Sequence, residues 1–481
     1  MTTSTARIPF LILGAGPTGL GAARRLQELG CHDWQLLEAS PEAGGLAASF
    51  VDDKGFTWDI GGHVQFSHYE YFDRAMIEFF GTDGWLHHQR ESWVWIRDRF
   101  IPYPFQNNIR RLPPEDLNNC LQGLVAITRS PRPKPANFGE WIDATFGAGL
   151  AEVFMRPYNF KVWAFPPELM NSVWVGERVA VTDLGHVLSN LVLAKDDLSW
   201  GPNNTFQFPK FGGTGAIWRE CAKRLPAEKL HFNTHAQRID LAQHEVTTSD
   251  GRTFRYDNLI STISLRDLIK LSGQAQLQPL ADRGLLYSTS NIIGLGLRGK
   301  PAPELATKCW MYFPEDNCPF YRVTVFSNYS PNNVPDITKN WSLMTETSES
   351  PHKPVNSAGL LEEVIQGVLN TRLIKSRDEI VSTWSYRANH GYPTPALHRD
   401  EVLAKIIPVF EKQDVWSRGR FGLWKYEVSN QDHSFMQGVE IVERLVNGRT
   451  EITATDANHT NSKKHPWPLE RWAAKSLEAK R

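Results

Sequence analysis

The sequence predicts an α/β protein in which a discontinuous Rossmann-like nucleotide-binding domain is joined to a helical domain and an antiparallel β-sheet domain. Residues 8–40 read as strand, glycine-rich turn, helix and strand, the βαβ pattern of a parallel sheet. Residues 110–200 show helical periodicity, whereas residues 285–350 contain short runs typical of antiparallel strands. At 481 residues the chain exceeds the roughly 250–300 residues at which one core stops growing, so we expect several domains.

The first element is a strand, Ile8–Leu13, followed at once by GAGPTG and a helical segment. In this G-x-G-x-x-G motif Gly14 permits the tight turn, Gly16 lets the backbone approach a pyrophosphate, and Gly19 allows close helix packing. Glu38 ends the second strand, about 20 residues further on, where a ribose hydroxyl needs an acceptor. The whole unit therefore predicts a dinucleotide site at a helix N-terminus.

A second pair of glycines helps to distinguish the two dinucleotides that share this motif. The stretch PEAGGLAASF, from Pro41 to Phe50, resembles the two-glycine extension of the large flavin family that contains amine oxidases and protoporphyrinogen oxidase. The resemblance favours FAD over NAD as the resident cofactor. It also implies that Gly45 and Leu46 contact it.

Composition excludes several classes of function. The 52 basic and 53 acidic residues leave a formal charge of −1, so no overall field attracts nucleic acid or an anionic membrane. The five cysteines form no C-x-x-C pair, which argues against a disulfide framework or a metal site. No apolar stretch of about 18 residues occurs, and the run IPFLIL is too short for a signal peptide. We therefore expect a reduced, cytoplasmic protein without a membrane span.

The remaining elements suggest how the domains are divided. Residues 238–264 read as short strands, with Ser249–Gly251 as a hairpin turn and a last strand that returns to the nucleotide sheet. The stretch PRPKP, Pro131–Pro135, reads as a stiff connector between helices. The tail after Gly448 is polar, and we expect it to be ordered only in pieces. The predicted domains are FAD-binding (1–90, 205–265 and 415–450), helical and substrate-binding (91–204), antiparallel sheet (266–414) and C-terminal tail (451–481).

Several longer motifs contain combinations of residues that folding alone does not require. They include GGHVQFSHYEYFD, PYPFQNNI, MRPYNFKVWAFPP, WVGERVA, CWMYFPEDNCPFYRVTVFSNYSP and SRGRFGLWKYEVSNQDHSFMQGVE. From about Ile8 to Gly448 the chain closely resembles the eukaryotic-type UDP-galactopyranose mutases. This resemblance implies interconversion of UDP-galactopyranose and UDP-galactofuranose, in which N5 of reduced FAD attacks the anomeric carbon and displaces UDP without net redox change. It also implies that NADPH binds transiently as the external reductant. The resemblance does not decide whether the protein is a homo-oligomer.

The resemblance assigns roles residue by residue. Gly61, Gly62 and His63 would line the flavin near N5, where His63 would steady the segment through a hydrogen bond. Arg178 and Arg322 would hold the diphosphate, since a planar guanidinium binds phosphate through two parallel bonds. The remaining cofactor contacts implied are Arg90 and Arg420 beside the FAD pyrophosphate, and Asn430, Gln431 and Ser434 where the last helix begins. The remaining substrate contacts implied are Tyr312, Tyr392 and Tyr426 (phosphates), Tyr103 and Gln106 (uridine), Phe154, Asn159 and Trp163 (around uracil), Asn203 and Trp310 (sugar), and Asn430.

One departure from the family pattern follows Arg178, where the chain reads VTDLGH. This segment belongs to a flap over the substrate, so closure or sugar preference could differ. Three alternatives stay open at this point. They are a mutase for another sugar nucleotide, a flavin oxidase acting on an amine or hydrophobic substrate, and a non-catalytic nucleotide-binding flavoprotein. The oxidase would not need Arg178, Arg322 and a set of tyrosines for a diphosphate.

Overall fold

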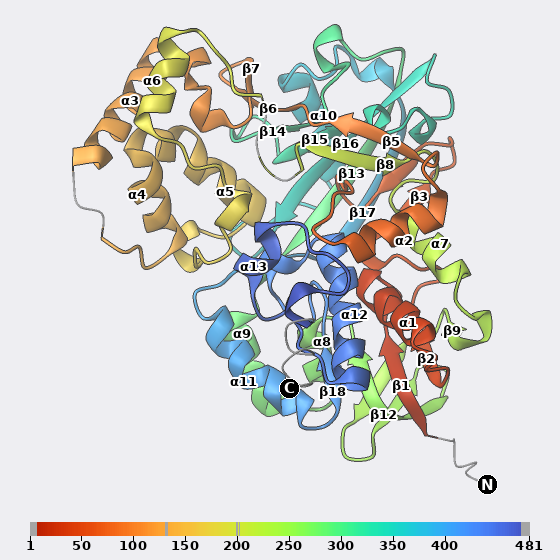
Figure 1. The fold of residues 1–481 in the computed structure, drawn as a ribbon. Helices are drawn as coiled ribbons and strands as arrows, with labels where there is room; N and C mark the ends of the chain where they lie inside the picture. The colour runs from red at the N-terminus through yellow and green to blue at the C-terminus, as the bar shows by residue number, and fades with distance from the viewer. Residues whose placement is uncertain (1–6, 130–132, 199–200, 202, 473–481) are drawn as a thin grey trace.

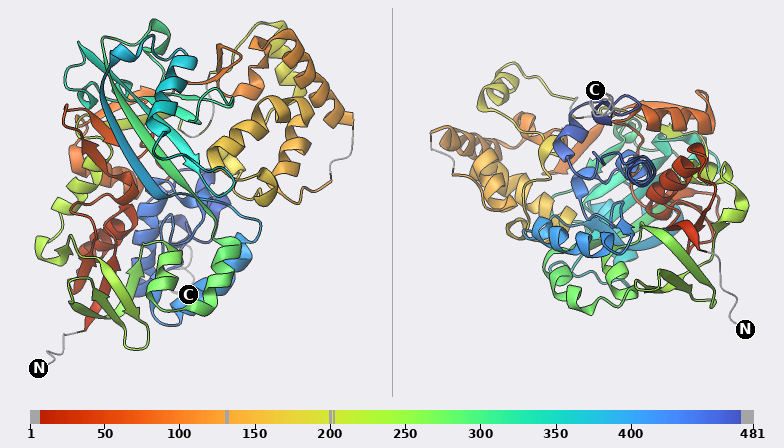
Figure 2. Two further views of the ribbon diagram at one scale, coloured as in Figure 1. Left: turned by 180° about the vertical axis from the view of Figure 1, so that it is seen from behind. Right: turned by 60° about the horizontal axis from the view of Figure 1, so that its bottom comes forward.

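The computed structural model describes residues 7–129, 133–198, 201 and 203–472. Figure 1 shows a helical domain (orange to yellow) projecting to one side of two stacked regions, an antiparallel sheet region and a nucleotide-binding region. The views from behind and from below show the same separation of the helical domain (Figure 2). The predicted fold class is confirmed. The connector Pro131–Pro135 lies partly outside the described residues.

The nucleotide-binding region is built on a mainly parallel sheet. The order β10-β11-β12-β1-β2-β9, with β18 also paired to β12, brings together strands from three separate segments of the chain. The strands are β1 (Ile8–Leu13), β2 (Trp34–Leu37), β9 (Leu230–His231), β10 (Ala236–Asp240), β11 (Glu245–Thr248), β12 (Thr253–Ser261) and β18 (Val415–Ser417). Strands β2, β9, β12 and β18 run parallel to β1, whereas β11 pairs antiparallel with both β10 and β12. The predicted hairpin is the β11–β12 pair, which the turn Ser249–Gly251 joins. The sheet is therefore discontinuous, as its sequence pattern predicted.

Two helices meet on one face of this sheet, α1 (Pro17–Glu28) and α12 (Gln431–Asn447). Glycines let their backbones approach, because a Cβ at Gly438 would lie 1.9 Å from the Thr18 carbonyl oxygen. A Cβ at Gly21 would lie 2.3 Å from the Phe435 carbonyl oxygen. This contact fixes the N-terminus of α12 relative to that of α1. The smaller elements around them are β3 (Ser49–Val51), β4 (Thr57–Asp59), α2 (Glu70–Phe80), β5 (Trp85–Gln89), β8 (Thr205–Pro209) and α7 (Gly215–Lys223).

The helical domain contains α3 (Pro114–Arg129), α4 (Phe138–Leu150), α5 (Arg156–Trp163) and α6 (Leu184–Val192). A π-helical turn, Ala151–Met155, joins α4 to α5. Phe138, Ile142, Phe146 and Leu150 follow the i, i+4 spacing of α4 and are fully buried. These side chains pack with α3 and α5 in one core, which holds α5 against the neighbouring sheet.

The antiparallel region is one sheet of order β17-β13-β16-β15-β14-β6-β7. Its members are β6 (Ser92–Ile96), β7 (Arg99–Pro102), β13 (Tyr287–Arg298), β14 (Trp310–Tyr312), β15 (Arg322–Val325), β16 (Asn340–Glu349) and β17 (Ile380–Pro393), with α10 (Leu360–Asn370) packed against it. Residues 92–102, grouped above with the helices, thus extend this sheet. Three helices from residues 266–414 instead pack against the nucleotide sheet: α8 (Leu265–Leu271), α9 (Gln278–Gly284) and α11 (Arg399–Glu411).

The C-terminal segment 449–472 is packed more closely than its polar composition suggests. Its apolar side chains Ile452, Leu469 and Trp472 are buried in the same core as α1 and α12. Glu451 is buried and forms ion pairs with Arg418 at 2.5 Å and with a second arginine at 2.8 Å. A short helix, α13 (Ala457–Ser462), follows. Across the described residues, no helix is both long and apolar enough to cross a membrane.

Candidate active site

The glycine-rich turn lies between β1 and α1, as predicted. Gly14 has φ of +101°, in the region that favours glycine, and a Cβ at Gly19 would lie 1.9 Å from the Gly14 carbonyl oxygen. At Gly16 a Cβ would come no closer than 3.9 Å to protein, at the Gly44 carbonyl oxygen. Gly14 and Gly19 are therefore required by the fold itself. Gly16 is not, which agrees with its predicted role in making room for a ligand.

The N-terminus of α1 is suited to an anion. No side chain caps it, and its first turn contains no acidic residue. Its backbone N–H groups and the helix dipole would therefore meet a pyrophosphate without competition from a carboxylate.

The predicted ribose acceptor lies at the same end of the sheet. Glu38 accepts hydrogen bonds from the Ala15 N–H at 2.6 Å and the Ser40 N–H at 2.8 Å. A carboxylate has about four acceptor sites, so two remain for hydroxyl groups. The second glycine pair joins this site, since the Gly44 N–H donates to the Ala15 carbonyl at 2.9 Å and a Cβ at Gly45 would lie 3.3 Å from the Gly16 Cα. These features fit a dinucleotide, although the contacts of Gly45 and of the half-buried Leu46 with FAD stay predictions.

The N-terminus of α12 carries three predicted residues. Asn430 is the N-cap, but its side chain caps nothing. Its Oδ1 instead accepts a 3.3 Å hydrogen bond from Arg178 Nη1. Gln431 accepts from the Trp218 indole N–H at 2.8 Å, and Ser434 is buried one turn into the helix. The structure therefore links this helix start to the flap arginine, while its contacts with a flavin stay predictions.

A buried carboxylate that the sequence reasoning missed, Glu346 on β16, holds the Gly61–His63 segment. The Gly62 N–H donates to Glu346 Oε1 at 3.0 Å. Gly61 has φ of +99°, and a Cβ at Gly62 would lie 2.7 Å from Thr324 Oγ1. Both glycines are therefore needed for contacts within the protein, in addition to any contact with a flavin ring.

The imidazole of His63 is half-buried, and within the described structure its Nδ1 has no hydrogen-bond partner. Its backbone N–H donates to the Gly61 carbonyl oxygen at 2.9 Å. Burial, opposed by Glu346 and reinforced by Arg420 and Arg322, lowers the pKa of His63 to about 4. The ring is therefore neutral near pH 7, and the predicted side-chain hydrogen bond would have to be made to a ligand.

Arg322 extends from β15 toward the same carboxylate. Its Nε and Nη2 donate to the two oxygens of Glu346 at 2.6 and 2.7 Å, and the Tyr321 hydroxyl donates to Oε2 at 2.8 Å. Burial alone would raise the pKa of Glu346, but the charge of Arg322 and these hydrogen bonds hold it below its usual value. Glu346 is therefore ionised, and the edge of Arg322 that remains for a phosphate is the Nη1 side.

Next to Arg322 lies a cavity of about 150 Å³ between the helical domain and the antiparallel sheet. It is lined mainly by aromatic and polar side chains. Ten of the predicted substrate residues meet there: Tyr103, Gln106, Phe154, Asn159, Trp163, Arg178, Tyr312, Arg322, Tyr392 and Tyr426. The structure thus brings together residues that are more than 300 positions apart in the sequence.

Two more arginines surround this cavity. Arg178 donates to the Glu427 carbonyl at 2.9 Å and lies over the Tyr426 ring at 4.8 Å. Arg420, assigned above to the FAD pyrophosphate, lies 4.8 Å over the Tyr392 ring and donates to Ser429 Oγ at 2.8 Å. Burial, reinforced by the charge of Arg178, lowers the pKa of Arg420. Arg420 therefore belongs to the group of residues predicted for the diphosphate, whereas its contact with FAD stays a prediction.

Arg90 is the other arginine assigned to the pyrophosphate, and it too lies among predicted substrate residues. Its Nη1 donates to Asn203 Oδ1 at 2.5 Å. Its guanidinium lies 5.6 Å from the Tyr103 ring centre and 5.9 Å from that of Trp310. Trp310 in turn donates its indole N–H to the Tyr312 hydroxyl at 2.6 Å. Asn203 and Trp310 do not line the cavity themselves, but each contacts a residue beside it: Asn203 contacts Arg90, and Trp310 contacts Tyr312.

The predicted uridine contacts are partly occupied by protein partners. Gln106 donates to the Ala180 carbonyl oxygen, and Asn159 donates to the Met155 carbonyl oxygen at 2.7 Å. The Phe154 ring stacks on that of Tyr158 at 5.1 Å and 7°. Tyr158, Tyr321 and Trp174 also line the cavity, and sequence reasoning had not selected them. All three stand inside the quoted motifs, so their aromatic character there was an available signal.

The divergent flap sequence VTDLGH is the start of α6. Asp183 is the N-cap, and its Oδ1 accepts from the His186 N–H at 2.9 Å. Arg178 precedes it in a 3₁₀ turn, Gly176–Arg178. The departure from the family pattern therefore supplies a helix cap and leaves Arg178 at the cavity.

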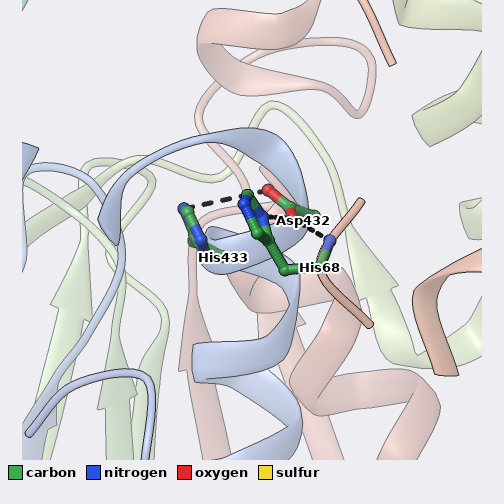
Figure 3. A group of neighbouring side chains, drawn as sticks. All are labelled: His68, Asp432 and His433. Carbon is green, nitrogen blue, oxygen red and sulfur yellow. Dashed lines mark hydrogen bonds and ion pairs between the residues drawn. The ribbon is translucent and has the colours of Figure 1, made fainter. Parts of the chain in front are cut away.

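A second polar cluster, His68, Asp432 and His433, lies outside the lining of this cavity (Figure 3). Asp432 Oδ2 accepts from the backbone N–H of His68 at 2.9 Å and lies 2.8 Å from its Nδ1. The two imidazoles stack at 4.8 Å with only 17° between their planes. Nitrogen lone pairs lie in the ring plane, so nearly parallel rings do not converge on one metal ion. The cluster is better explained as an anchor that ties residues 65–68 to the start of α12.

Comparison with known proteins agrees with this arrangement. The family described as flavin containing amine oxidoreductase matches residues 17–383. A fatty acid isomerase from P. acnes (14% identity, 93% of this chain and 100% of its own, TM-score 0.60) and putrescine oxidase (12%, 92% and 99%, 0.59) share the fold. A crystal structure of reduced UDP-galactopyranose mutase is 49% identical, covers 96% of this chain and 98% of its own, and has a TM-score of 0.93. Because that identity extends over nearly the whole chain, the protein belongs to the UDP-galactopyranose mutase family, within the flavin-containing amine oxidoreductases.

Proposed function

We propose that this protein interconverts UDP-galactopyranose and UDP-galactofuranose with a reduced FAD cofactor and no net redox change. When bound and reduced, FAD supplies at N5 the nucleophile that displaces UDP from the anomeric carbon of the sugar. The observation that carries the proposal is the position of Glu346. Its carboxylate joins Gly62, from the predicted flavin-facing segment, to Arg322, from the predicted diphosphate site. This link brings the segment predicted to face flavin N5 beside an arginine predicted to bind phosphate, which supports the proposal.

The protein's own residues then have distinct tasks. Arg178, Arg322 and Arg420 bind the diphosphate of the leaving group, which stabilises the negative charge that develops when the bond to the anomeric carbon breaks. Tyr392 and Tyr426 flank these arginines and exclude water. The imidazole of His63 is neutral, so it adds no cation beside the anomeric carbon, and its Nδ1 is available for a hydrogen bond to a ligand.

The test exploits the requirement for reduction. The oxidised protein should be inert toward UDP-galactofuranose, and dithionite or NADPH should activate it under anaerobic conditions. Chromatography should then show many sugars converted per reducing equivalent, because the electrons return to the cofactor in each cycle. Consumption of one reductant per sugar, or oxygen uptake without conversion, would refute the proposal in favour of an oxidase. NADPH oxidation by the protein would be followed separately by the absorbance of the reduced nicotinamide.

A further inference from the structure

Arg178, which we predict binds the diphosphate, is held by hydrogen bonds to residues near the start of α12. Its Nη2 donates to the Glu427 carbonyl oxygen at 2.9 Å, and its Nη1 donates to Asn430 Oδ1 at 3.3 Å. Glu427 is itself fixed, because its buried carboxylate accepts two hydrogen bonds, at 2.8 and 2.7 Å, from the fully buried Arg399. The Glu427 carbonyl is therefore a rigid acceptor for the arginine.

A second donor to that carbonyl comes from the C-terminal segment 449–472. Asn461 in α13 donates from Nδ2 to the Glu427 carbonyl at 3.0 Å and to the Ala457 carbonyl at 2.9 Å. A carbonyl oxygen has two lone pairs, so Arg178 and Asn461 together use both. α13 packs against the 3₁₀ turn Tyr426–Val428, which contains this carbonyl, and lies beside the helical domain (Figure 1). The C-terminal segment thus shares an acceptor with an arginine of the predicted active site.

Two further atoms of these residues are complementary. Arg178 Nε and Asn461 Oδ1 are both buried, and among the described residues neither has a hydrogen-bond partner. One is a donor and the other is an acceptor. Both residues line a second cavity of about 180 Å³, whereas Arg178 also lines the predicted substrate cavity. The second cavity exceeds the roughly 10–15 Å³ that one water needs, so a single water between the two atoms would satisfy both.

We propose that Asn461 is a positioning residue for Arg178. It uses the second lone pair of the Glu427 carbonyl and accepts the Arg178 Nε–H through water, which keeps the guanidinium turned toward the predicted diphosphate site. Without Asn461 the guanidinium can turn into the second cavity, and a ligand must then order it at a cost in affinity. The C-terminal segment thereby contributes to substrate affinity without contacting the substrate. This inference rests on the proposed function.

A purely structural role of Asn461 would have a different consequence. If Asn461 only stabilised α13, its loss would change UDP affinity by the same factor whether or not Arg178 is present. Positioning requires that the effect on UDP affinity disappear when Arg178 is removed. The decisive measurement is therefore a double-mutant cycle on UDP binding.

The experiment titrates reduced holoenzymes with UDP: wild type, Asn461→Leu, Arg178→Ala and the double variant. Leucine keeps the approximate size of the side chain but has no polar atom. Asn461→Leu should raise the UDP dissociation constant at least fivefold, and in the Arg178→Ala background the same change should raise it less than twofold. Asn458→Ala is the matched control, because Asn458 is an exposed residue of α13 that lines the same cavity. Its UDP dissociation constant should stay within twofold of wild type.

A second variant covers the case in which Asn461→Leu does not fold. Asp456 is the N-cap of α13, and its Oδ1 accepts from the His459 N–H at 3.0 Å. Asp456→Ala loosens this helix and leaves the side chains of Arg178 and Asn461 unchanged. It should raise the UDP dissociation constant at least twofold, and only where Arg178 is present.

The outcomes separate this inference from the proposed function. Wild-type UDP affinity in a folded Asn461→Leu variant would overturn the positioning role, as would equal factors with and without Arg178. If that variant does not fold, the same two results for Asp456→Ala would overturn it. All of these results leave the mutase proposal intact. Failure of the wild-type holoenzyme to bind UDP would overturn both.

Discussion

Substituting Gly16 by alanine should weaken FAD binding without unfolding the protein. A Cβ at this position would meet its nearest protein atom, the Gly44 carbonyl oxygen, at 3.9 Å, which is ordinary van der Waals contact. The backbone angle φ of −77° is also accessible to alanine. Gly19 differs sharply, because its added Cβ would lie 1.9 Å from the Gly14 carbonyl oxygen. Comparing Gly16→Ala with Gly19→Ala therefore distinguishes a glycine needed for the ligand from a glycine needed for folding.

The magnitude follows from the hydrogen bonds at risk. A methyl group at Gly16 would push a pyrophosphate away from the backbone N–H groups at the start of α1. Hydrogen bonds to charged groups contribute about 1.5–3 kcal/mol each, so loss of one should weaken FAD binding roughly 10- to 150-fold. The free energy of unfolding of the apoprotein should change by no more than about 1 kcal/mol, because the helix N-cap changes only from glycine to alanine.

Fluorescence titration of the apoproteins with FAD, combined with urea unfolding, measures both quantities. Gly16→Ala should bind FAD weakly and unfold near the wild-type urea midpoint. Gly19→Ala should lose stability even without FAD, since a backbone carbonyl cannot move aside cheaply. Wild-type FAD affinity in Gly16→Ala would refute the placement of the pyrophosphate. A large loss of apoprotein stability in that variant would refute the steric reasoning.

Three further predictions concern the cavity and its loop. Arg178→Ala should lower kcat/KM at least tenfold in a steady-state assay while the protein stays yellow with flavin, because a charge-assisted bond to the diphosphate is lost; unchanged kcat/KM would exclude this contact. Tyr312→Phe should lower kcat/KM about fivefold, since it loses any phosphate bond and leaves the Trp310 N–H without its 2.6 Å acceptor, and full activity would assign the tyrosine to packing alone. His63→Gln should make the free energy of unfolding less sensitive to acid. In the folded wild type the pKa of His63 is about 4, lowered from 6.5. The unfolded chain therefore takes up this proton first, and wild-type stability is lost as the pH falls from 6.5 toward 4. If the urea midpoints of wild type and His63→Gln shifted equally between pH 7 and pH 5, this prediction would be contradicted.

The nucleotide-binding part could be predicted because its signals are local. Gly14, Gly16 and Gly19 lie within six residues; Gly14 and Gly19 have steric reasons within the protein, whereas Gly16 leaves room for a ligand. The hairpin at Ser249–Gly251 is equally local and was confirmed. The predicted helices and strands of the other two regions were also found, since their periodicity is read over short windows.

Glu346 was missed because its hydrogen-bond partner Gly62 is distant in the sequence. Its partner Gly62 lies 284 residues away, and in NWSLMTETSE it is one of several polar residues and one of two glutamates in a strand. The only available signal was an acidic residue within a run otherwise suited to a buried strand, and burial of an unpaired carboxylate is costly. The C-terminal segment was underestimated for a similar reason. Its polar residues are satisfied by distant groups, such as Glu451 with Arg418 at 2.5 Å.

The charges around the cavity explain why three arginines are not redundant. Arg322 is neutralised by Glu346. Arg178 and Arg420 donate to carbonyl, amide and hydroxyl oxygens, and among the described residues neither forms an ion pair with a carboxylate. Within the part of the chain that the structure describes, these two cations thus have no counter-ion, and they lie beside aromatic rings that exclude water. A diphosphate ester carries about two negative charges, so it can replace the missing counter-ions while Glu346 keeps Arg322 in place. The same balance disfavours a neutral amine or fatty substrate, which would leave both half-buried cations unpaired.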